Sequence, residues 1–323
     1  MARNDIDATG WLIEDRDSQV VKAYTHTSAW EKVARPVTMT ANVVEIPRID
    51  DMDVDVIPKG GAYGEDTSTA SVIAIRARKF GKALRIAEED VEDKKLADYL
   101  DAKKASAGSS FAKKFDNAAI GVNAVENGTT VPFTSLYKTL TTVDATTGYT
   151  ANANHRGLTV AAFAAAGAAY DTLNELIAIA EESDYYDETQ VNIVAHPYFR
   201  RVLRGIKDGQ GRPLFLTDFV NGRRVDNLFG LPVVWSNGAK VSAVASTKVA
   251  GALGVKGTTG NPLLAVVNKA AAVIGNRKPF ESVVIPGRDG TSALTDEDIL
   301  KVRARKAAGV TMPQAHAIYE QLA

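Results

Sequence analysis

Hydrophobic and polar residues alternate in two segments of the N-terminal third of the chain. Residues 37–43, VTMTANV, alternate between apolar and polar side chains, which predicts a half-buried strand that ends at Pro47. A second strand is predicted between Val72 and Ile86. The polar segment between them is rich in Asp and Gly and, at about 25 residues, is far longer than a usual hairpin loop. We therefore expect this segment to be either disordered or an arm that packs on something outside its own subunit.

The strongest pattern is helical and covers residues 88–125. Apolar side chains recur there every three or four residues and form one stripe, whose predicted core positions include Leu96, Leu100, Phe111 and Phe115. Acidic residues crowd the first turns, where the helix dipole favours negative charge. A helix of this length spans about 50 Å, so we expect the fold to be elongated along it.

Short apolar segments alternate with polar turns in the rest of the chain. Residues 126–157 are predicted to be a loop with a short hairpin, and residues 158–182 a second helix. A further helix is expected to start at Pro197, before a turn at residues 207–213. The predicted strands are residues 191–195, 231–235, 263–267, 271–275 and 300–305, and the last of these has one buried and one strongly basic face. This mixture predicts an α+β fold with few βαβ units.

The composition excludes several classes of protein. The 323 residues include 38 basic and 39 acidic side chains, a net charge of −1, which excludes a nucleic-acid binder that depends on a large basic excess. The absence of cysteine excludes disulfides, iron–sulfur clusters and thiolate zinc sites. The longest mostly apolar run, residues 158–170, is too short to span a bilayer. We therefore expect a soluble protein without a membrane partner, with about two domains or one large one.

A search for catalytic and ligand-binding motifs predicts no catalytic, cofactor or metal site. None of the four histidines has a second histidine or a carboxylate at helical spacing, and no serine-hydrolase elbow occurs. The aspartates that precede Pro58 lack the closing Glu of a calcium-binding loop. The predicted long helix carries two lysine pairs, Lys103 with Lys104 and Lys113 with Lys114. We expect these pairs to face either solvent or a polyanion such as DNA. We therefore expect no enzymatic activity.

The order of the segments is informative as well. A strand, a long loop with Pro and Gly, and a returning strand precede the string IAEEDVEDKKLADYLDAKKASAGSSFAKKFDNAAI. Further along the chain come VNIVAHPYFRRVLRGIKDGQGRPLF, VDNLFGLPVVWSN and ILKVRARKAAGVTMPQAHAIYEQL. In this order the segments resemble the tailed-bacteriophage major capsid proteins of the Hong Kong 97 fold. The first string is similar to that family's spine helix, and the later ones are similar to its axial-domain turn, its Leu-x-Gly-x-Pro-Val-Val element and its closing strand.

The resemblance implies that the chain has five parts. They are an N-terminal arm (1–36), an extended-loop hairpin (37–86), a peripheral domain with a spine helix (87–190), an axial domain (191–290) and a closing strand that returns to the peripheral domain (291–323). The extended loop would lie over a neighbouring subunit through Pro58, Lys59, Gly60, Gly61 and Gly64, where glycine permits a positive φ or a close backbone approach. The axial-domain turn would consist of Lys207, Asp208, Gly211, Arg212 and Pro213.

The resemblance also implies a function and a set of partners. Copies of a major capsid protein self-assemble into pentamers and hexamers of an icosahedral shell, which encloses double-stranded DNA without reading its sequence. Further implied partners are a separate scaffolding protein, a portal and, in some shells, a decoration protein. Assembly would take place in the host cytoplasm, and the protein would be found in the virion capsid. Two alternatives stay open, an encapsulin-type nanocompartment shell of the same fold and a cytosolic α+β enzyme.

Overall fold

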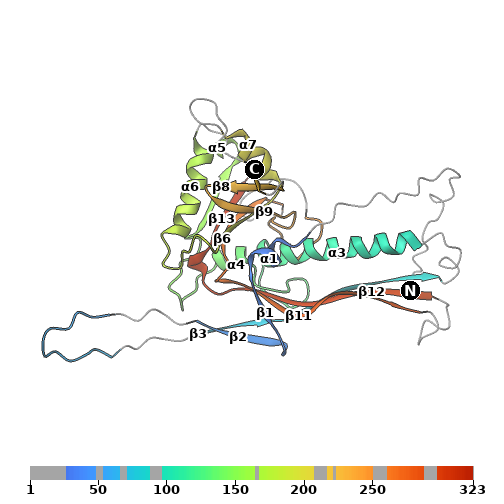
Figure 1. The fold of residues 1–323 in the computed structure, drawn as a ribbon, viewed down its shortest axis with the longest axis horizontal. Coiled ribbons are helices and arrows are strands. Elements are labelled where there is room, and N and C mark those ends of the chain that lie inside the picture. The colour runs from blue at the N-terminus through green and yellow to red at the C-terminus, as the bar shows by residue number, and fades with distance from the viewer. Residues whose placement is uncertain are drawn as a thin grey trace.

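The molecule is elongated and combines helices with three sheets. The structure is a computed structural model that describes residues 27–48, 54–65, 71–87, 97–163, 167–206, 217–220, 223–249, 260–286 and 297–322. A long helix lies beside a narrow sheet, a two-stranded hairpin projects at the other end, and a second sheet with its helices stands to one side (Figure 1). The predicted α+β class and the predicted elongation are both confirmed.

A four-stranded sheet runs along the long axis of the body. In spatial order its strands are β1 (Arg35–Thr38), β11 (Ala272–Ile285), β12 (Glu297–Val310) and β4 (Arg78–Ala87). The long helix α3 (Ala97–Ile120) lies along one face of this sheet (Figure 1). β11 continues far beyond the predicted residues 271–275, because its second half, which is largely exposed, still pairs with β12.

The projecting hairpin contains β2 (Val43–Arg48) and β3 (Ser71–Arg76), which form a two-stranded sheet. It corrects the sequence prediction in three places. The strand predicted between Val72 and Ile86 is two strands, because the chain leaves the hairpin at Ala77 and enters the four-stranded sheet as β4. The predicted strand 37–43 is in fact parts of β1 and β2, separated by a bend at residues 39–42. Pro47 lies inside β2 rather than ending it, because a two-stranded ribbon leaves one edge of each strand unpaired, where a missing N–H breaks no ladder bond.

A seven-stranded mixed sheet forms the second part of the body. Its order is β5 (His155–Thr159), β13 (Ala317–Leu322), β10 (Leu263–Asn268), β6 (Val191–Ala195), β9 (Leu231–Trp235), β8 (Arg223–Leu228) and β7 (Thr217–Val220). The predicted strands 191–195 and 231–235 are confirmed to the residue. The prediction that residues 300–305 form the last strand is wrong. After β12 the chain continues into one more strand, the buried β13.

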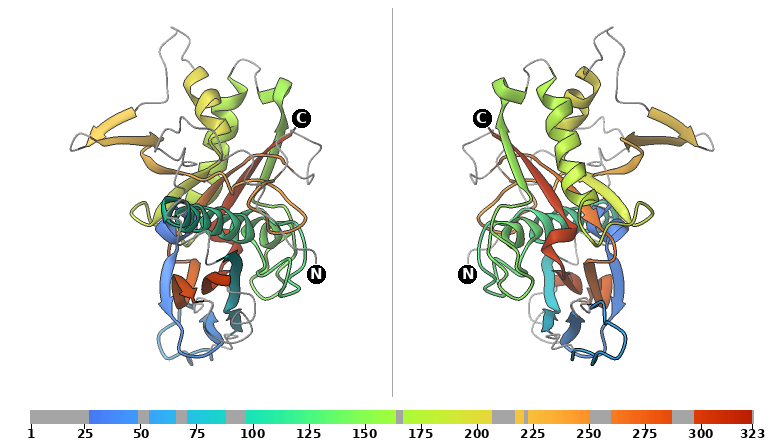
Figure 2. Two further views of the ribbon diagram at one scale, coloured as in Figure 1. Left: turned by 90° about the vertical axis from the view of Figure 1, so that its right-hand side faces the viewer. Right: turned by 90° about the vertical axis from the view of Figure 1, so that its left-hand side faces the viewer.

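Three helices accompany the seven-stranded sheet, namely α5 (Val160–Phe163), α6 (Ala168–Glu181) and α7 (Tyr198–Gly205). Viewed along α3, α6 and α7 lie on the side of that helix opposite to the four-stranded sheet (Figure 2). α7 starts directly after Pro197, as predicted. The single predicted helix 158–182 is wrong, because its first two residues complete β5 and Gly167, with a φ of +82°, precedes α6.

Three short helical segments complete the described chain, namely α1 (Ala29–Val33), α4 (Leu136–Leu140) and the 3-10 helix η3 (Pro313–Ala315). The predicted loop 126–157 therefore contains a helix, and a single bridge between Asp144 and Tyr149 replaces the predicted hairpin. α3 ends at Ile120, short of the predicted residue 125, and residues 88–96 of the predicted helix lie outside the described residues.

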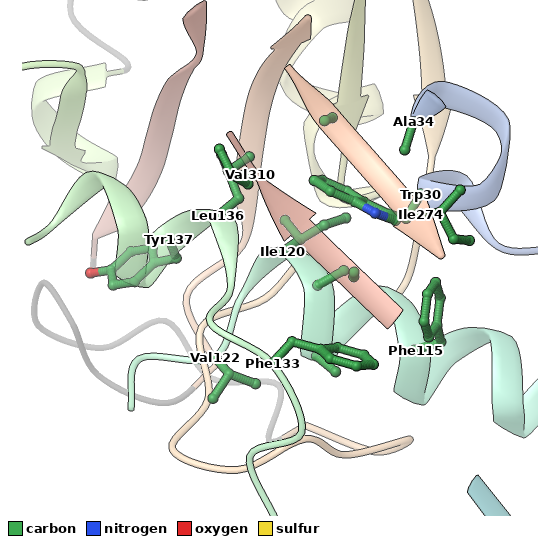
Figure 3. Close-up of a cluster of buried hydrophobic side chains, with 14 of the residues drawn as sticks. Trp30, Ala34, Phe115, Ile120, Val122, Phe133, Leu136, Tyr137, Ile274 and Val310 are labelled. Carbon is green, nitrogen blue, oxygen red and sulfur yellow. The ribbon is translucent and has the colours of Figure 1, made fainter. Parts of the chain in front are cut away.

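Two hydrophobic cores stabilise the body. The larger core lies among α1, α3 and the four-stranded sheet and includes Trp30, Phe115 and Ile274 (Figure 3). The smaller core lies between the seven-stranded sheet and α6 and α7, and it includes Phe199 and Tyr319. Alternate side chains of β10 belong to the two cores, so this strand is buried on both faces and joins them.

Candidate intersubunit surface

The loop between β2 and β3 exposes apolar side chains. Within its described part, residues 54–65, Val54 is 82 %, Tyr63 86 % and Val56 99 % exposed. Leaving such side chains exposed to water, rather than buried, costs about 25 cal/mol for each Å² of apolar surface. A projecting loop with three exposed apolar side chains is typical of a surface that another molecule covers.

The glycines predicted to matter in this loop form a tight turn. The Gly61 N–H donates to the Pro58 carbonyl at 2.8 Å, with Lys59 and Gly60 as the central residues. Gly60 has a φ of +84°, the conformation that the third residue of a type II turn requires. A Cβ on Gly61 would lie 3.1 Å from the Pro58 carbonyl oxygen, and one on Gly64 would lie 3.0 Å from a carboxylate oxygen of Asp55. The structure therefore has a positive φ at Gly60 and a close backbone approach at Gly61, and the contact of this loop with another subunit stays a prediction.

The predicted stripe of α3 contributes to an aromatic cluster. Phe115 is fully buried and Phe111 is half-buried, with ring centroids 5.8 Å apart. Phe80 of β4 contacts both rings, at 5.5 and 6.0 Å, and Phe133 packs edge-on against Phe115 at 5.8 Å. The stripe is therefore confirmed at these two positions. Leu96 lies outside the described residues, and only the backbone of Leu100 is described.

The four lysines proposed to face DNA do not form one patch. Lys103 is exposed, and Lys104 is only partly exposed and donates to Asp101 at 3.1 Å. At 100° per residue, Lys103 and Lys114 lie about 20° apart around the helix, whereas Lys104 lies about 20° from Phe111. Lys113 and Lys114 are partly exposed. The predicted axial-domain turn, residues 207–213, lies outside the described residues.

The basic face predicted for residues 300–305 is present on β12. Leu300 and Ala304 are buried, and Lys301, Arg303 and Arg305 alternate with them. Arg303 and Lys278 bind the Glu281 carboxylate, and these hydrogen bonds hold the pKa of Glu281 below its usual value.

A buried carboxylate that the sequence analysis missed joins three segments of the body. Asp116 of α3 accepts hydrogen bonds from Ser28 Oγ at 2.5 Å, Ala29 N at 2.9 Å, Trp30 N at 3.2 Å and Ser236 Oγ at 2.6 Å. It therefore caps the first turn of α1 and ties this helix to the spine helix. The Ser28-x-x-Glu31 pattern could have indicated the start of α1, because Ser28 Oγ accepts the Glu31 N–H, but nothing local indicates a partner 88 residues away.

Within the described ranges, no group of three or more His, Asp or Glu side chains could hold a metal ion, and no helix is long and apolar enough to cross a membrane. Burial lowers the pKa of two histidines, the partly buried His196 and the fully buried His316, and both have roles in the fold. His316 Nδ1 accepts the Asn268 N–H at 3.2 Å, and burial lowers the pKa of His316 to about 4. His196 Nδ1 accepts the Tyr198 N–H at 3.1 Å, and burial, with the nearby Lys240, lowers the pKa of His196 to about 3.

Comparison with known proteins identifies both a family and a fold. Residues 10–254 match the phage capsid family. No curated protein sequence matches the chain. A solved structure from Mycobacterium phage Bobi has a TM-score of 0.67 at 15% identity, and the alignment covers 98% of this chain and 97% of that one. A structure from Microbacterium phage Oxtober96 has a TM-score of 0.65 at 16% identity, with 98% and 97% covered.

A third solved structure, the capsid of an empty GTA particle, has a TM-score of 0.63 at 16% identity, and the alignment covers 100% of both chains. Likenesses at such identities establish the fold, and the family match establishes membership across most of the chain. The chain therefore belongs to the phage capsid family and has the Hong Kong 97 fold that its motifs predicted.

Proposed function

We propose that this chain is the major capsid protein of a tailed double-stranded DNA phage and that its copies assemble through the extended loop into pentamers and hexamers of an icosahedral shell. The observation that carries the proposal is the exposure of Val54, Val56 and Tyr63 on a hairpin without a core of its own. Full burial of one such side chain contributes about 1.5–3 kcal/mol. A second subunit that covers the loop would gain this free energy at every contact of the shell.

The two sheets support a division of the body into two domains. In our proposal, the four-stranded sheet and α3 form the peripheral domain, and the seven-stranded sheet with α6 and α7 forms the axial domain. The boundary then follows the sheets rather than continuous ranges of sequence. β11 belongs with the peripheral sheet although it lies in the range 191–290, and β13 belongs with the axial sheet.

The finer partners follow from the resemblance of the sequence to the family. We propose that a scaffolding protein, a portal and, in some shells, a decoration protein contact the assembled form, which is built in the host cytoplasm. The net charge of −1 supports only local contacts with the enclosed DNA. Such contacts would be with phosphates and would weaken with salt.

Electron microscopy and hydrogen exchange together test this function. Purified protein is expected to form closed shells in negative stain, with amides of residues 54–65 exchanging freely in free subunits and slowly in shells. A Val56→Asp and Tyr63→Ser double variant should lower the shell yield at least tenfold and leave the subunit folded. The matched control is Val125→Asp, at a valine that is 74% exposed away from this loop. A small oligomer that never forms shells would contradict the proposal, and shells that enclose protein instead of DNA would favour the encapsulin alternative.

A further inference from the structure

The strand β2 ends at Arg48, directly before the extended loop. The hairpin packs on the larger core through Ile75, which is buried, and through Ile46 and Ile73, which are partly buried. The outward-facing residues are solvated, and Val72 is 54% exposed. The direction of the loop therefore depends on what holds the outer end of the hairpin.

Arg48 makes that connection, and its side chain is only 9% exposed. Its Nη1 donates to an Asp144 carboxylate oxygen at 2.7 Å and to the Thr311 carbonyl at 3.1 Å. Its Nε donates to Ser71 Oγ at 3.0 Å. One guanidinium therefore joins the opposite strand of the hairpin, the turn after α4 and the end of β12.

The acceptors of Arg48 are themselves fixed in place. Asp144 exchanges backbone hydrogen bonds with Tyr149 at 3.1 and 3.0 Å, and its second carboxylate oxygen accepts the Thr146 N–H at 3.1 Å. The Thr311 N–H and hydroxyl both bind the Ala271 carbonyl, at 2.8 and 3.0 Å. Partial burial alone would raise the pKa of Asp144, but the hydrogen bond and charge of Arg48, together with further hydrogen bonds, hold it below its usual value. The carboxylate is therefore ionised at neutral pH, and the ion pair persists.

The shape of the guanidinium makes these contacts directional. Arginine presents its N–H groups in a rigid planar fork, so acceptors on three segments fix the orientation of the side chain as well as its position. A lysine in its place would supply the charge without the fork. Apolar contacts along the hairpin are non-directional, so they leave the angle of the hairpin less well determined.

We propose that Arg48 is a positioning residue for assembly, which fixes the direction in which the extended loop leaves the subunit and thereby where the loop meets a second copy. This inference rests on the proposed function. Every subunit of a closed shell repeats the same contact, so an error in loop direction is repeated at each one. A loop held at the wrong angle should produce open or irregular assemblies rather than unfolded subunits.

Three variants and one control test the proposal. Arg48→Ala removes the clamp, Arg48→Lys keeps the charge alone, and Asp144→Asn removes the charge of the acceptor while keeping its size. The control is Arg156→Ala, because Arg156 also forms an ion pair, at 2.8 Å with the exposed Glu175, but belongs to β5 in the seven-stranded sheet and not to the hairpin. The readouts are amide exchange of free subunits and the fraction of closed, uniform shells in negative stain.

Arg48→Ala and Asp144→Asn should raise amide exchange in β2 and β3 at least tenfold and leave β6 and β10 at the wild-type rate, since β2 and β3 form a separate two-stranded sheet that can open locally. Closed shells should fall at least fivefold in both variants, and Arg48→Lys should lie between Arg48→Ala and wild type. Wild-type shells from Arg48→Ala, or faster exchange in β6 and β10 as well, would overturn the proposal. If Arg48→Ala is insoluble, wild-type shells from Asp144→Asn would overturn it instead.

The same experiment separates this inference from the function on which it rests. Shells from wild type and Arg156→Ala, together with unaffected shells from Arg48→Ala, would refute only the positioning role. Absence of shells from wild type and the control alike would refute the proposed function itself.

Discussion

Replacing Asp116 with alanine should detach α1 from the spine helix. The carboxylate is fully buried and accepts hydrogen bonds from two backbone N–H groups and two hydroxyls. The hydroxyls of Ser28 and Ser236 can rotate toward other acceptors, but the N–H groups of Ala29 and Trp30 cannot. Each buried donor without a partner costs about 1–3 kcal/mol, so we expect a loss of about 4 kcal/mol in the free energy of unfolding. That is a large part of the 5–15 kcal/mol typical of a folded domain.

The loss can be measured by chemical denaturation, and its location by fluorescence. In a background with Trp11→Phe and Trp235→Phe, emission reports on Trp30, which is a fully buried residue of α1. Asp116→Ala should lower the unfolding midpoint and shift the native emission to the red. The control is Asp101→Ala, because Asp101 is 75% exposed on the same helix and pairs only weakly with Lys104. A loss below about 1 kcal/mol, with unchanged Trp30 emission, would refute the capping role.

Four further tests follow from the same structure. Phe115→Ala should cost about 3–5 kcal/mol in chemical denaturation, since the ring is fully buried; a cost near zero would contradict its place in the core. The pKa of His316 is lowered to about 4 in the fold, so between pH 6.5 and 4 the unfolded state binds a proton that the folded state excludes. His316 should then lower the stability by about 1.4 kcal/mol for each unit that the pH drops, and His196, whose pKa is lowered to about 3, should add a similar loss. An unfolding free energy that stays flat on acidification would refute both assignments. Gly60→Val should lower the shell yield without changing the melting of free subunits, because valine disfavours a φ of +84°, and normal shells would count against a role for this turn. Free subunits should bind duplex DNA weakly and lose it as salt rises, whereas salt-resistant binding would contradict phosphate contacts by the four lysines of the spine helix, Lys103, Lys104, Lys113 and Lys114.

Elements whose pattern reports burial directly could be predicted from the sequence. β6 and β9 are short apolar runs with turn residues at both ends, and their predicted bounds match the structure. The Phe111–Phe115 stripe was predictable because one face of α3 packs on the sheet. β11 was mostly missed, because the polar residues Asn276, Arg277 and Lys278 interrupt its apolar pattern and its second half, which is only partly buried, is a strand through its ladder with β12. Pro47 wrongly indicated the end of a strand, because only the pairing of β2 shows which edge of that strand is free.

The two polar anchors could not have been found in the same way. Asp116 and Ser28 are 88 residues apart, and Arg48 and Asp144 are 96 apart. Neither pair belongs to a motif with a fixed spacing, and each residue taken alone looks like an ordinary surface charge. The chain is predictable where short-range periodicity determines structure. It is not predictable where two distant segments must first be folded beside each other for a charge to find its partner.

Apolar and polar contacts have different roles in this subunit. In the proposed assembly, apolar contacts set the affinity between subunits, and polar contacts set the direction in which the extended loop points. The two cores are closed within the body, whereas the apolar side chains of residues 54–65 stay exposed for another molecule. The free energy of apolar burial is proportional to the buried area and depends little on the angle at which two surfaces meet. Arg48 at the hairpin and Asp116 at α1 supply the angle, since hydrogen bonds to a charged group are directional. Changes at Val56 or Tyr63 should therefore alter how many shells form, and changes at Arg48 should alter which shapes form.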